Sequence, residues 1–571
     1  MRINRKGILR WSAAVLAVQT VGSLWGLPAA SQQTAAHAQV LNNAAVSEAI
    51  TSDVSEPLGV MAQTPSVSGA GVVVHPIMQP KLNKLNVDVT GLSAVASYAS
   101  APGPLVSARV GLSFKGIGQV GGRLDCPSVS RFTVVPPDTN AAVGDTQVVE
   151  WVNLCYAVFD KSTGDLIAGP FAGNRFWKSF GGPCGKNNDG DPIIQWDKTH
   201  HRWVASQNVF NGPPFYTCVA VSQTADATGR YFRYAFPQQP GFPDYPKWGL
   251  TPTGYYQTQN VFDPNNFGFL GVNVCAYQSS AMLTGGRNAK QVCIFDDSKD
   301  TLFDDSMLPA DDDSTRPANS VAQPEVLLGS IDNFYPGGPT VYEYVFKVDF
   351  LHPENSTLAG VNGSMPILVP RYNLALCGSQ PNLTLYCVPQ PDPAKQRLDT
   401  LGDRLMYRLA RFDDGDTQHF MVTHSVNNTS AVAARWYEFR AEEGSTHLSL
   451  YQSGQTPDDG HYRWMGSVAR DKMGDIALGY SRSSDAPGDF PSIYYTGQTA
   501  GDSQGTTETE HLIVRGGGAQ YASYNRWGDY SSMALDGADS CTFWYANEYY
   551  PKGGSFDWST WLASLKFRHC P

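Results

Sequence analysis

The chain has 571 residues, of which 55 are Gly, 38 are Pro, 12% are aromatic and only 16% are charged. This composition is too apolar and aromatic for a mostly disordered chain, and it favours strands and turns. The 41 basic and 52 acidic residues give a net charge of −11, and no Lys/Arg cluster follows the first ten residues. Nucleic acid and anionic membrane surfaces are therefore poor partners for this chain.

The first 38 residues have the pattern of a secretory signal peptide. Four basic residues lie within the first ten, an apolar run spans 11–27, and Ala36-His37-Ala38 is a small-x-small cleavage motif. The alternative is a retained membrane or lipid anchor, but three polar residues interrupt the apolar run. Because no second apolar span follows, the sequence predicts a secreted or periplasmic bacterial protein, a monomer without a transmembrane span once the signal is removed.

Residues 39–105 are rich in Ala, Ser, Val, Asn and Pro, contain one aromatic residue and show no sustained periodicity. We expect a weakly ordered, low-complexity leader or linker there. From residue 106 the chain changes to strand-length runs separated by turn signals, with no long amphipathic helical window. Residues 106–571 are therefore predicted to form a single all-β domain.

The strand runs of this domain repeat. Units of about four short runs open at residues 137, 190, 243, 402, 463 and 526, and a less regular unit spans 320–373. Asp138, Asp191 and Asp244 open the first three units at an identical spacing of 53 residues. A repeat of this length indicates one architecture built from similar modules rather than several unrelated domains.

Units of this size and number match the sequence signature of a β-propeller, with seven blades favoured and six as the alternative. The last unit shows only three strands, and the run at 108–117 is expected to supply the fourth, which would pair the two ends of the domain. The aspartates at 311–313, ahead of the irregular unit, are interpreted as part of an inserted loop.

All ten cysteines lie after residue 125, an even number with no C-x-x-C pair, which in an exported protein favours disulfides over zinc. Sequence does not fix the connectivity. Pairing in chain order would close short loops, joining Cys126 to Cys155, Cys184 to Cys218, Cys275 to Cys293, Cys377 to Cys387 and Cys541 to Cys570.

Several units carry specific motifs: GDP at 190–192, FPDYPK at 242–247, RWGDYS at 526–531 and CTFWYANEYY at 541–550. In these motifs the chain resembles a family of exported bacterial proteins with sialidase-like, BNR-type β-propellers, over roughly residues 125–570. The resemblance implies the propeller architecture more than an activity, since most members are uncharacterised. The chain departs from true sialidases, because it has no S-x-D-x-G-x-x-W Asp-box.

Equivalent positions of propeller blades form a ring around the central channel, so the residues that open the units should converge. Carboxylates there could act as acid and base or nucleophile on a glycan, while aromatic rings stack on sugars and cationic groups bind acidic substituents. The candidate catalytic residues are Asp138, Asp191, Asp244, Asp529 and Tyr530, and the candidate ligand-binding residues are Asn140, Lys247, Arg404, Arg463, Trp464, Arg526 and Trp527. The alternative is structural, because an Asp at a strand start often caps a turn and a neighbouring Arg can pair with it.

Acidic clusters at 187–191 and 413–416 offer oxygen ligands near turns, as calcium requires. Asp189 and Asp191 are the candidate metal ligands, although neither cluster has EF-hand spacing and both are also typical of solvated turns. No nucleotide, flavin or haem motif occurs, so no cofactor is expected other than, as a weaker alternative, structural calcium.

Two functions remain open. In the first, the chain is a secreted carbohydrate-active propeller, a glycoside hydrolase or lyase that acts on an extracellular glycan at the mouth of the central channel. In the second, it is a non-catalytic surface propeller that binds a glycan or a protein. Open carboxylates about 5 to 9.5 Å apart would favour hydrolysis, whereas turn-capping aspartates under a hydrophobic plug would exclude it.

Overall fold

The computed structural model describes residues 38–61, 73–74, 107–119, 124–126, 134–297, 305–315, 323–330, 338–375, 386–391, 396–521 and 525–571. These residues belong to one compact unit, Ala38–Pro571. The predicted signal peptide lies, apart from Ala38, outside the described residues.

The unit consists mainly of antiparallel sheets in which consecutive strands of the chain are neighbours. The first sheet contains β7 (Asn140–Val143), β8 (Gln147–Val152), β9 (Cys155–Asp160) and β10 (Leu166–Ala172). The second contains β11 (Ile193–Asp197), β12 (Arg202–Val209), β13 (Phe215–Ser222) and β14 (Tyr231–Gln238). The third contains β15 (Phe242–Thr251), β16 (Gly254–Phe262), β17 (Phe269–Tyr277) and β18 (Lys290–Asp296).

An eleven-stranded sheet follows, made of two antiparallel groups and the short edge strand β1 (Val40–Leu41). The first group contains β19 (Leu308–Asp312), β20 (Glu325–Ser330), β21 (Thr340–Lys347), β22 (Thr357–Ala359) and β23 (Pro366–Leu368). The second contains β24 (Asn373–Leu374), β27 (Leu405–Asp413), β28 (Thr417–Asn427), β29 (Val432–Glu442) and β30 (Ser449–Gln455). A short parallel pairing of β19 with β27 joins the two groups.

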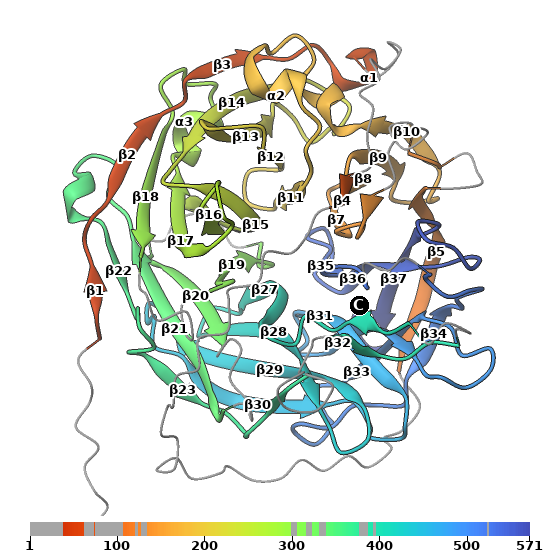
Figure 1. The fold of residues 1–571 in the computed structure, drawn as a ribbon. Coiled ribbons are helices and arrows are strands. Elements are labelled where there is room, and N and C mark those ends of the chain that lie inside the picture. The colour runs from red at the N-terminus through yellow and green to blue at the C-terminus, as the bar shows by residue number, and fades with distance from the viewer. Residues whose placement is uncertain are drawn as a thin grey trace, which may run out of the picture. The chain divides into compact units, whose positions relative to one another are not determined.

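The last two sheets complete a ring of sheets around a common centre, the arrangement of a β-propeller (Figure 1). One contains β31 (Tyr462–Arg470), β32 (Ile476–Ser483), β33 (Ser492–Gln498) and β34 (His511–Val514). The other contains β35 (Ser532–Leu535), β36 (Thr542–Tyr549), β37 (Ser559–Phe567) and, from the opposite end of the domain, β5 (Ala108–Gly118). The pairing of β5 with β37 confirms the strand predicted at 108–117.

Short elements lie between the sheets. They are η1 (Gly173–Trp177), α2 (Gly182–Lys186), α3 (Ser279–Met282), η2 (Pro353–Asn355) and the two-stranded pair β25 (Tyr386–Val388) and β26 (Leu398–Asp399).

Many strands are buried on both faces because each sheet packs between two others. All six residues of β8 and all nine of β16 are buried. One core cluster brings Met421 of β28 against Tyr494 of β33 and Tyr545 of β36, and thus spans three sheets. The aromatic residues that the composition contains in excess fill these wedges, where each large ring removes much apolar surface from water.

The prediction of a weakly ordered leader over 39–105 is wrong for its first part. Residues 40–54 form three strands, β1 (Val40–Leu41), β2 (Ala45–Glu48) and β3 (Thr51–Val54), followed by α1 (Leu58–Met61). These strands add to the outer edges of three successive sheets by pairing with β22, β18 and β14. We call residues 40–54 the outer strap (Figure 1). Residues 73–74 form β4 (Val73–Val74), which pairs with β6 (Val134–Val135).

The interpretation of 311–313 as an inserted loop is also wrong. Asp311 and Asp312 end β19, and Asp313 follows directly. All three are buried, which a surface loop of three acidic residues would not be. Burial is compatible with their charge because Arg408 pairs with Asp311 and Asp313, and Lys198 with Asp313 at 2.8 Å.

Four of the five predicted disulfides are confirmed: Cys126–Cys155, Cys184–Cys218, Cys275–Cys293 and Cys541–Cys570. The fifth prediction involves Cys377, which lies outside the described residues. The Cys275–Cys293 bridge joins directly opposed residues of β17 and β18, so it links neighbouring strands as expected.

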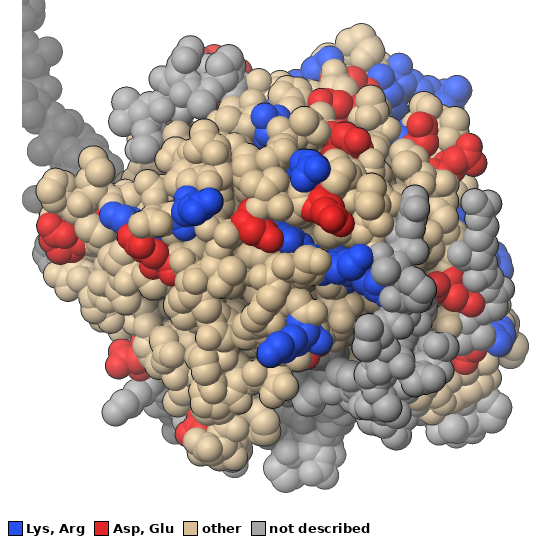
Figure 2. Space-filling view, turned by 90° about the horizontal axis from the view of Figure 1, so that it is seen from above, with Lys and Arg blue, Asp and Glu red and all other residues tan. Residues whose placement is uncertain are grey.

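Charged side chains are sparse on the surface. On the face seen in Figure 2, acidic and basic residues are interspersed over a mostly uncharged surface. Within the described part of the chain, no helix is long and apolar enough to cross a membrane.

The outer strap is expected to contribute to stability through Arg233, whose side chain is only 2% exposed and whose carboxylate partner is Asp53 of the strap. Replacing Asp53 with Ala leaves a buried guanidinium without its carboxylate. We expect the free energy of unfolding to fall by about 1 to 3 kcal/mol, measured by urea unfolding. Glu48→Ala, an exposed acid of the same strap, is the control. Equal losses in both variants would contradict the role of this ion pair.

Candidate functional site

A recurring backbone conformation marks the start of the inner strands. Six non-glycine residues there adopt left-handed φ angles between 46° and 60°: Asp138, Asp191, Tyr245, Ser306, Met465 and Asp529. This conformation is uncommon for residues with a side chain, so its recurrence at corresponding positions of different sheets indicates a shared structural requirement. In the third sheet the position belongs to Tyr245, one residue after the predicted Asp244.

The side chains near these positions meet at the centre of the ring. Tyr530 Oη lies 3.5 Å from Asp138 Oδ2, and the Tyr245 amide donates to Asp191 Oδ2 at 3.2 Å. The Lys247 ammonium lies 3.3 Å from the ring centroid of Tyr245 and 4.2 Å from that of Tyr530. Asp244 interacts electrostatically with Asp191, Asp529 and two arginines. We call the following set the central cluster: Asp138, Asp191, Asp244, Tyr245, Lys247, Asp403, Arg404, Arg526, Asp529 and Tyr530.

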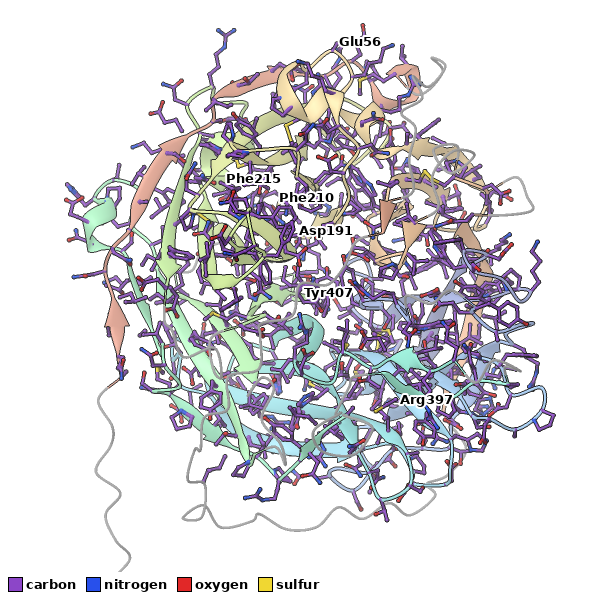
Figure 3. All side chains as sticks on the ribbon, viewed as in Figure 1. Glu56, Asp191, Phe210, Phe215, Arg397 and Tyr407 are labelled. Carbon is purple, nitrogen blue, oxygen red and sulfur yellow. A yellow bond between two sulfur atoms is a disulfide. The ribbon has the colours of Figure 1, made fainter. Side chains whose placement is uncertain are left out.

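These residues come from sheets that are far apart in the sequence, and the structure brings them together. Asn140 is linked to the cluster through Tyr407, because its Nδ2 donates to Tyr407 Oη at 3.2 Å. The ring of Tyr407 in turn lies 5.3 Å from that of Tyr530. Figure 3 shows Asp191 and Tyr407 near the centre of the ring of sheets.

Both arginines of the central cluster already hold a carboxylate. Arg404 forms a two-point pair with Asp403, 2.9 Å at each contact, and also donates to Ser306 Oγ at 2.8 Å. Arg526 Nη2 contacts both carboxylate oxygens of Asp529. Such pairs neutralise the guanidinium charge locally. Lys247 is the cation of the cluster that holds no such two-point pair. It is therefore the cation that remains for Asp138, Asp191 and Asp244.

Burial and the excess of carboxylates over cations shift the pKa values of the cluster. Burial, reinforced by Asp529 and Asp191, raises the pKa of Asp138 well above its usual range. Burial, reinforced mainly by Asp191, raises the pKa of Asp244 to about 8. Burial lowers the pKa of Lys247 to about 7, although Asp138 and Asp191 oppose that change. The cluster therefore retains protons on carboxyl groups at neutral pH.

Nine of the ten residues of the central cluster are buried. Asp138, Asp191 and Asp529 are 4 to 5% exposed, whereas Asp244 is partly exposed. Oδ1 of Asp138 has no hydrogen-bond partner among the described residues.

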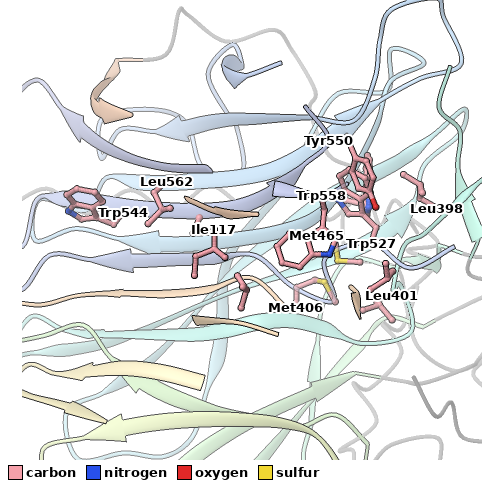
Figure 4. Packing of buried hydrophobic residues seen from close by; sticks show 14 of the residues in the cluster. Ile117, Leu398, Leu401, Met406, Met465, Trp527, Trp544, Tyr550, Trp558 and Leu562 are labelled. Carbon is pink, nitrogen blue, oxygen red and sulfur yellow. The ribbon is translucent and has the colours of Figure 1, made fainter. Parts of the chain in front are cut away.

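Three predicted ligand-binding residues lie elsewhere, so their assignment to the ring is a correction. Arg463 pairs with Asp459 and Glu510. Trp464 and Trp527 are fully buried, with ring centroids 5.8 Å apart in a hydrophobic core. Figure 4 shows Trp527 packed with Met465 and Tyr550 in that core. Fully buried rings offer no face on which a sugar could stack, so these tryptophans stabilise the fold.

The two predicted metal ligands face different neighbours. Asp189 Oδ2 accepts from the backbone amides of Phe210 and Asn211, at 2.8 and 3.3 Å. Asp191 belongs to the central cluster. At 413–416, Asp414 accepts from two backbone amides, as the turn alternative requires. Calcium binding stays a prediction.

In the described ranges, a different set of three side chains has the spacing of a metal site: Asp471, Cys541 and Cys570. Its two sulfur atoms form a disulfide with each other. Since a thiolate is the form of cysteine that binds a metal, this set does not qualify as a metal site in its oxidised state.

Sequence reasoning missed two tyrosines of this region. Tyr245 stands next to the predicted Asp244, and aligning the unit openings by one further residue would have found it. Tyr407 lies within a strand, three residues after Arg404, and no sequence signal separates it from other core tyrosines.

Comparison with known proteins found no matching family model and no matching curated protein. Among solved structures, an endosialidase of phage phi92 is similar with a TM-score of 0.28 and 7% identity, covering 65% of this chain and 66% of that one. Drosophila Semaphorin 1b, extracellular domains 1-2, gives 0.35 and 7%, covering 82% and 88%. An α-L-arabinanase of Penicillium chrysogenum in complex with arabinobiose gives 0.30 and 9%, covering 66% and 94%. Likenesses this distant do not establish what this chain binds.

The raised pKa of Asp244 predicts how stability depends on pH. An acid with a higher pKa in the folded state binds more protons there than in the unfolded state. Its contribution to stability is therefore lost as pH rises from about 4 to about 8. In Asp244→Asn this loss disappears, so stability should fall less steeply between pH 5 and 8, by up to about 1 kcal/mol per pH unit.

Urea midpoints at four pH values would measure the effect, with Asp485→Asn at an exposed site as the control. Identical pH profiles for the wild type and Asp244→Asn would show that Asp244 has an ordinary pKa.

Proposed function

We propose that the chain is an exported, carbohydrate-active propeller that cleaves an extracellular glycan at the central cluster, as a glycoside hydrolase or lyase. The observation that carries this proposal is Asp244, a partly exposed carboxyl group whose pKa is raised to about 8 by desolvation and by the neighbouring Asp191. Such a group is protonated at neutral pH, as the general acid of a glycosidase must be. A carboxylate next to it, Asp191, supplies the second member of an acid–base pair.

The roles of the other residues follow from their contacts. Burial raises the pKa of Asp191, and the charge of Lys247 and the hydrogen bond from the Tyr245 amide oppose that rise. Asp244 would protonate the leaving oxygen while Asp191 acts as base or nucleophile. Tyr530 and Asp138 lie beside this pair, and Arg526 holds Asp529 in place.

The alternative function, non-catalytic binding of a glycan or protein, has its own support. Four of the five carboxylates of the central cluster are at most 5% exposed. The ion pairs of Arg404 and Arg526 also have the character of structural contacts. A cluster closed in this way could instead fix the inner strands while loops at the surface bind a partner.

Seven blades are part of the proposal. Counting the two antiparallel groups of the eleven-stranded sheet separately gives seven sheets of about four strands, and the parallel β19–β27 contact then joins two blades. Export is supported by the four disulfides, which persist in oxidising compartments.

The proposal predicts that the protein lacking residues 1–38 releases new reducing or unsaturated ends from an acidic or neutral polysaccharide. Asp244→Asn and Asp191→Asn should each lower the rate by about 10²- to 10⁴-fold, because each removes one proton-transfer group. Activity should decline above about pH 8, where Asp244 loses its proton. Asp485→Asn should leave the rate unchanged.

Two outcomes would change the conclusion. Turnover that survives both central substitutions would place the chemistry elsewhere. Saturable binding of a polysaccharide without any release of ends would favour the alternative, a binding propeller.

A further inference from the structure

A second polar cavity lies away from the central cluster. It has a volume of about 270 Å³ and lies between the turn that joins β15 to β16, the strands β19 and β20, and the hairpin of β27 and β28. None of the described residues that line it belongs to the central cluster. The lining residues used below are Thr251, Thr253, Asp312, Glu325, Arg411 and Asp413.

The cavity contains an acceptor with no partner. Glu325 is 2% exposed, and its Oε1 has no hydrogen-bond partner in the described part of the chain. A buried carboxyl oxygen in that state is costly, because it has lost water without gaining a donor. Burial raises the pKa of Glu325 well above its usual range, although Arg411 and the Ala310 amide oppose that change.

The same cavity contains a donor with no partner. Nε of Arg411 is buried and unpaired among the described residues. Its two terminal nitrogens lie 3.4 Å from Asp312 and 3.3 Å from Asp413, longer than the usual 2.7 to 2.9 Å of a close guanidinium–carboxylate contact. The guanidinium is therefore loosely held and has donor capacity left for a ligand.

An unmet donor and an unmet acceptor in one cavity select the chemistry of the occupant. An anion would satisfy Arg411 but would face the carboxylates, and a cation would satisfy the carboxylates but would face Arg411. A hydroxyl group accepts from the guanidinium and donates to the carboxyl oxygen at the same time. The threonine hydroxyls at 251 and 253 add further partners of that kind.

The size of the cavity fits a small polyhydroxylated molecule. A water molecule takes about 30 Å³ of liquid volume, so about 270 Å³ exceeds what one or two bridging waters need. We infer that this cavity is a second carbohydrate site, which takes one neutral monosaccharide unit through Glu325 and Arg411. The unit could be a free sugar or the end of a glycan chain, since both present the same hydroxyl groups. This inference does not rest on the proposed function of the central cluster.

The test is binding of neutral monosaccharides (D-glucose, D-galactose and L-arabinose) to the protein without its first 38 residues, by ligand-observed NMR and calorimetry. We expect saturable binding in the millimolar range for at least one of them. Glu325→Ala should weaken that binding at least tenfold, because it removes the oxygen that accepts from the sugar hydroxyl. Acetate and methylammonium should bind more weakly than the sugar.

The control variant carries the same substitution as the test variant, at a glutamate in a similar environment. Glu343 is also 2% exposed and also has an Oε1 without a partner in the described ranges, but it does not line the cavity. Glu343→Ala should therefore leave sugar binding unchanged, as should Asp485→Asn at an exposed site. If Glu325→Ala does not fold, Thr253→Trp provides a second test, because the large ring at the β15–β16 turn would fill the cavity.

The outcomes separate the alternatives. An oligosaccharide that binds at least as tightly as its free sugar indicates a chain end as the occupant, and preference for the free sugar indicates a monosaccharide. No saturable binding up to about 100 mM would mean that only water fills the cavity and would overturn the inference. Equal binding by the wild type, Glu325→Ala and Thr253→Trp would also overturn it. Loss in Asp244→Asn alone would overturn it too, because it would assign the binding to the central cluster.

Discussion

The pairing of β5 with β37 is the constraint on which the other features depend. It joins a strand that precedes the first sheet to the last strand of the final sheet, so the ring is closed by backbone hydrogen bonds. Because the ring is closed, residues as distant in sequence as Asp138 and Tyr530 come within 3.5 Å of each other. An open array of the same sheets would leave an exposed edge at each end and would not bring these side chains together.

The sequence predicted the features that depend on periodicity. Equal spacing was enough to bring Asp138 and Asp191 to the same end of the ring, because both residues precede the inner strand of their sheet by two positions. Prediction from the sequence failed where side-chain packing determines the position of a residue. Trp464 and Trp527 are neighbours in sequence of the residues that open their units. Large aromatic side chains gain most from burial in the space between sheets, and both tryptophans lie in the hydrophobic core. Spacing alone also could not show that Tyr245 takes the left-handed position beside Asp244.

Burial explains the acidic segments as well. The aspartates at 311–313 look like a loop because acidic runs seldom occur inside a domain. The partner that makes their burial tolerable, Arg408, lies almost a hundred residues away, and only the folded chain brings it there.

The central cluster and the second cavity differ in how closely their arginines are paired with carboxylates. In the first, each arginine is held closely by a carboxylate, whereas in the second Arg411 is held loosely.

The outer strap has a consequence for the order in which the chain can fold during synthesis. Its three strands are among the earliest residues made after residue 38, yet they pair with β14, β18 and β22. The last of these ends at residue 359, so β1 cannot dock until more than half of the chain exists. β5 must wait still longer, until β37 is complete. The early segments therefore remain without their partners while the sheets form, and contacts this distant in sequence predict slow folding.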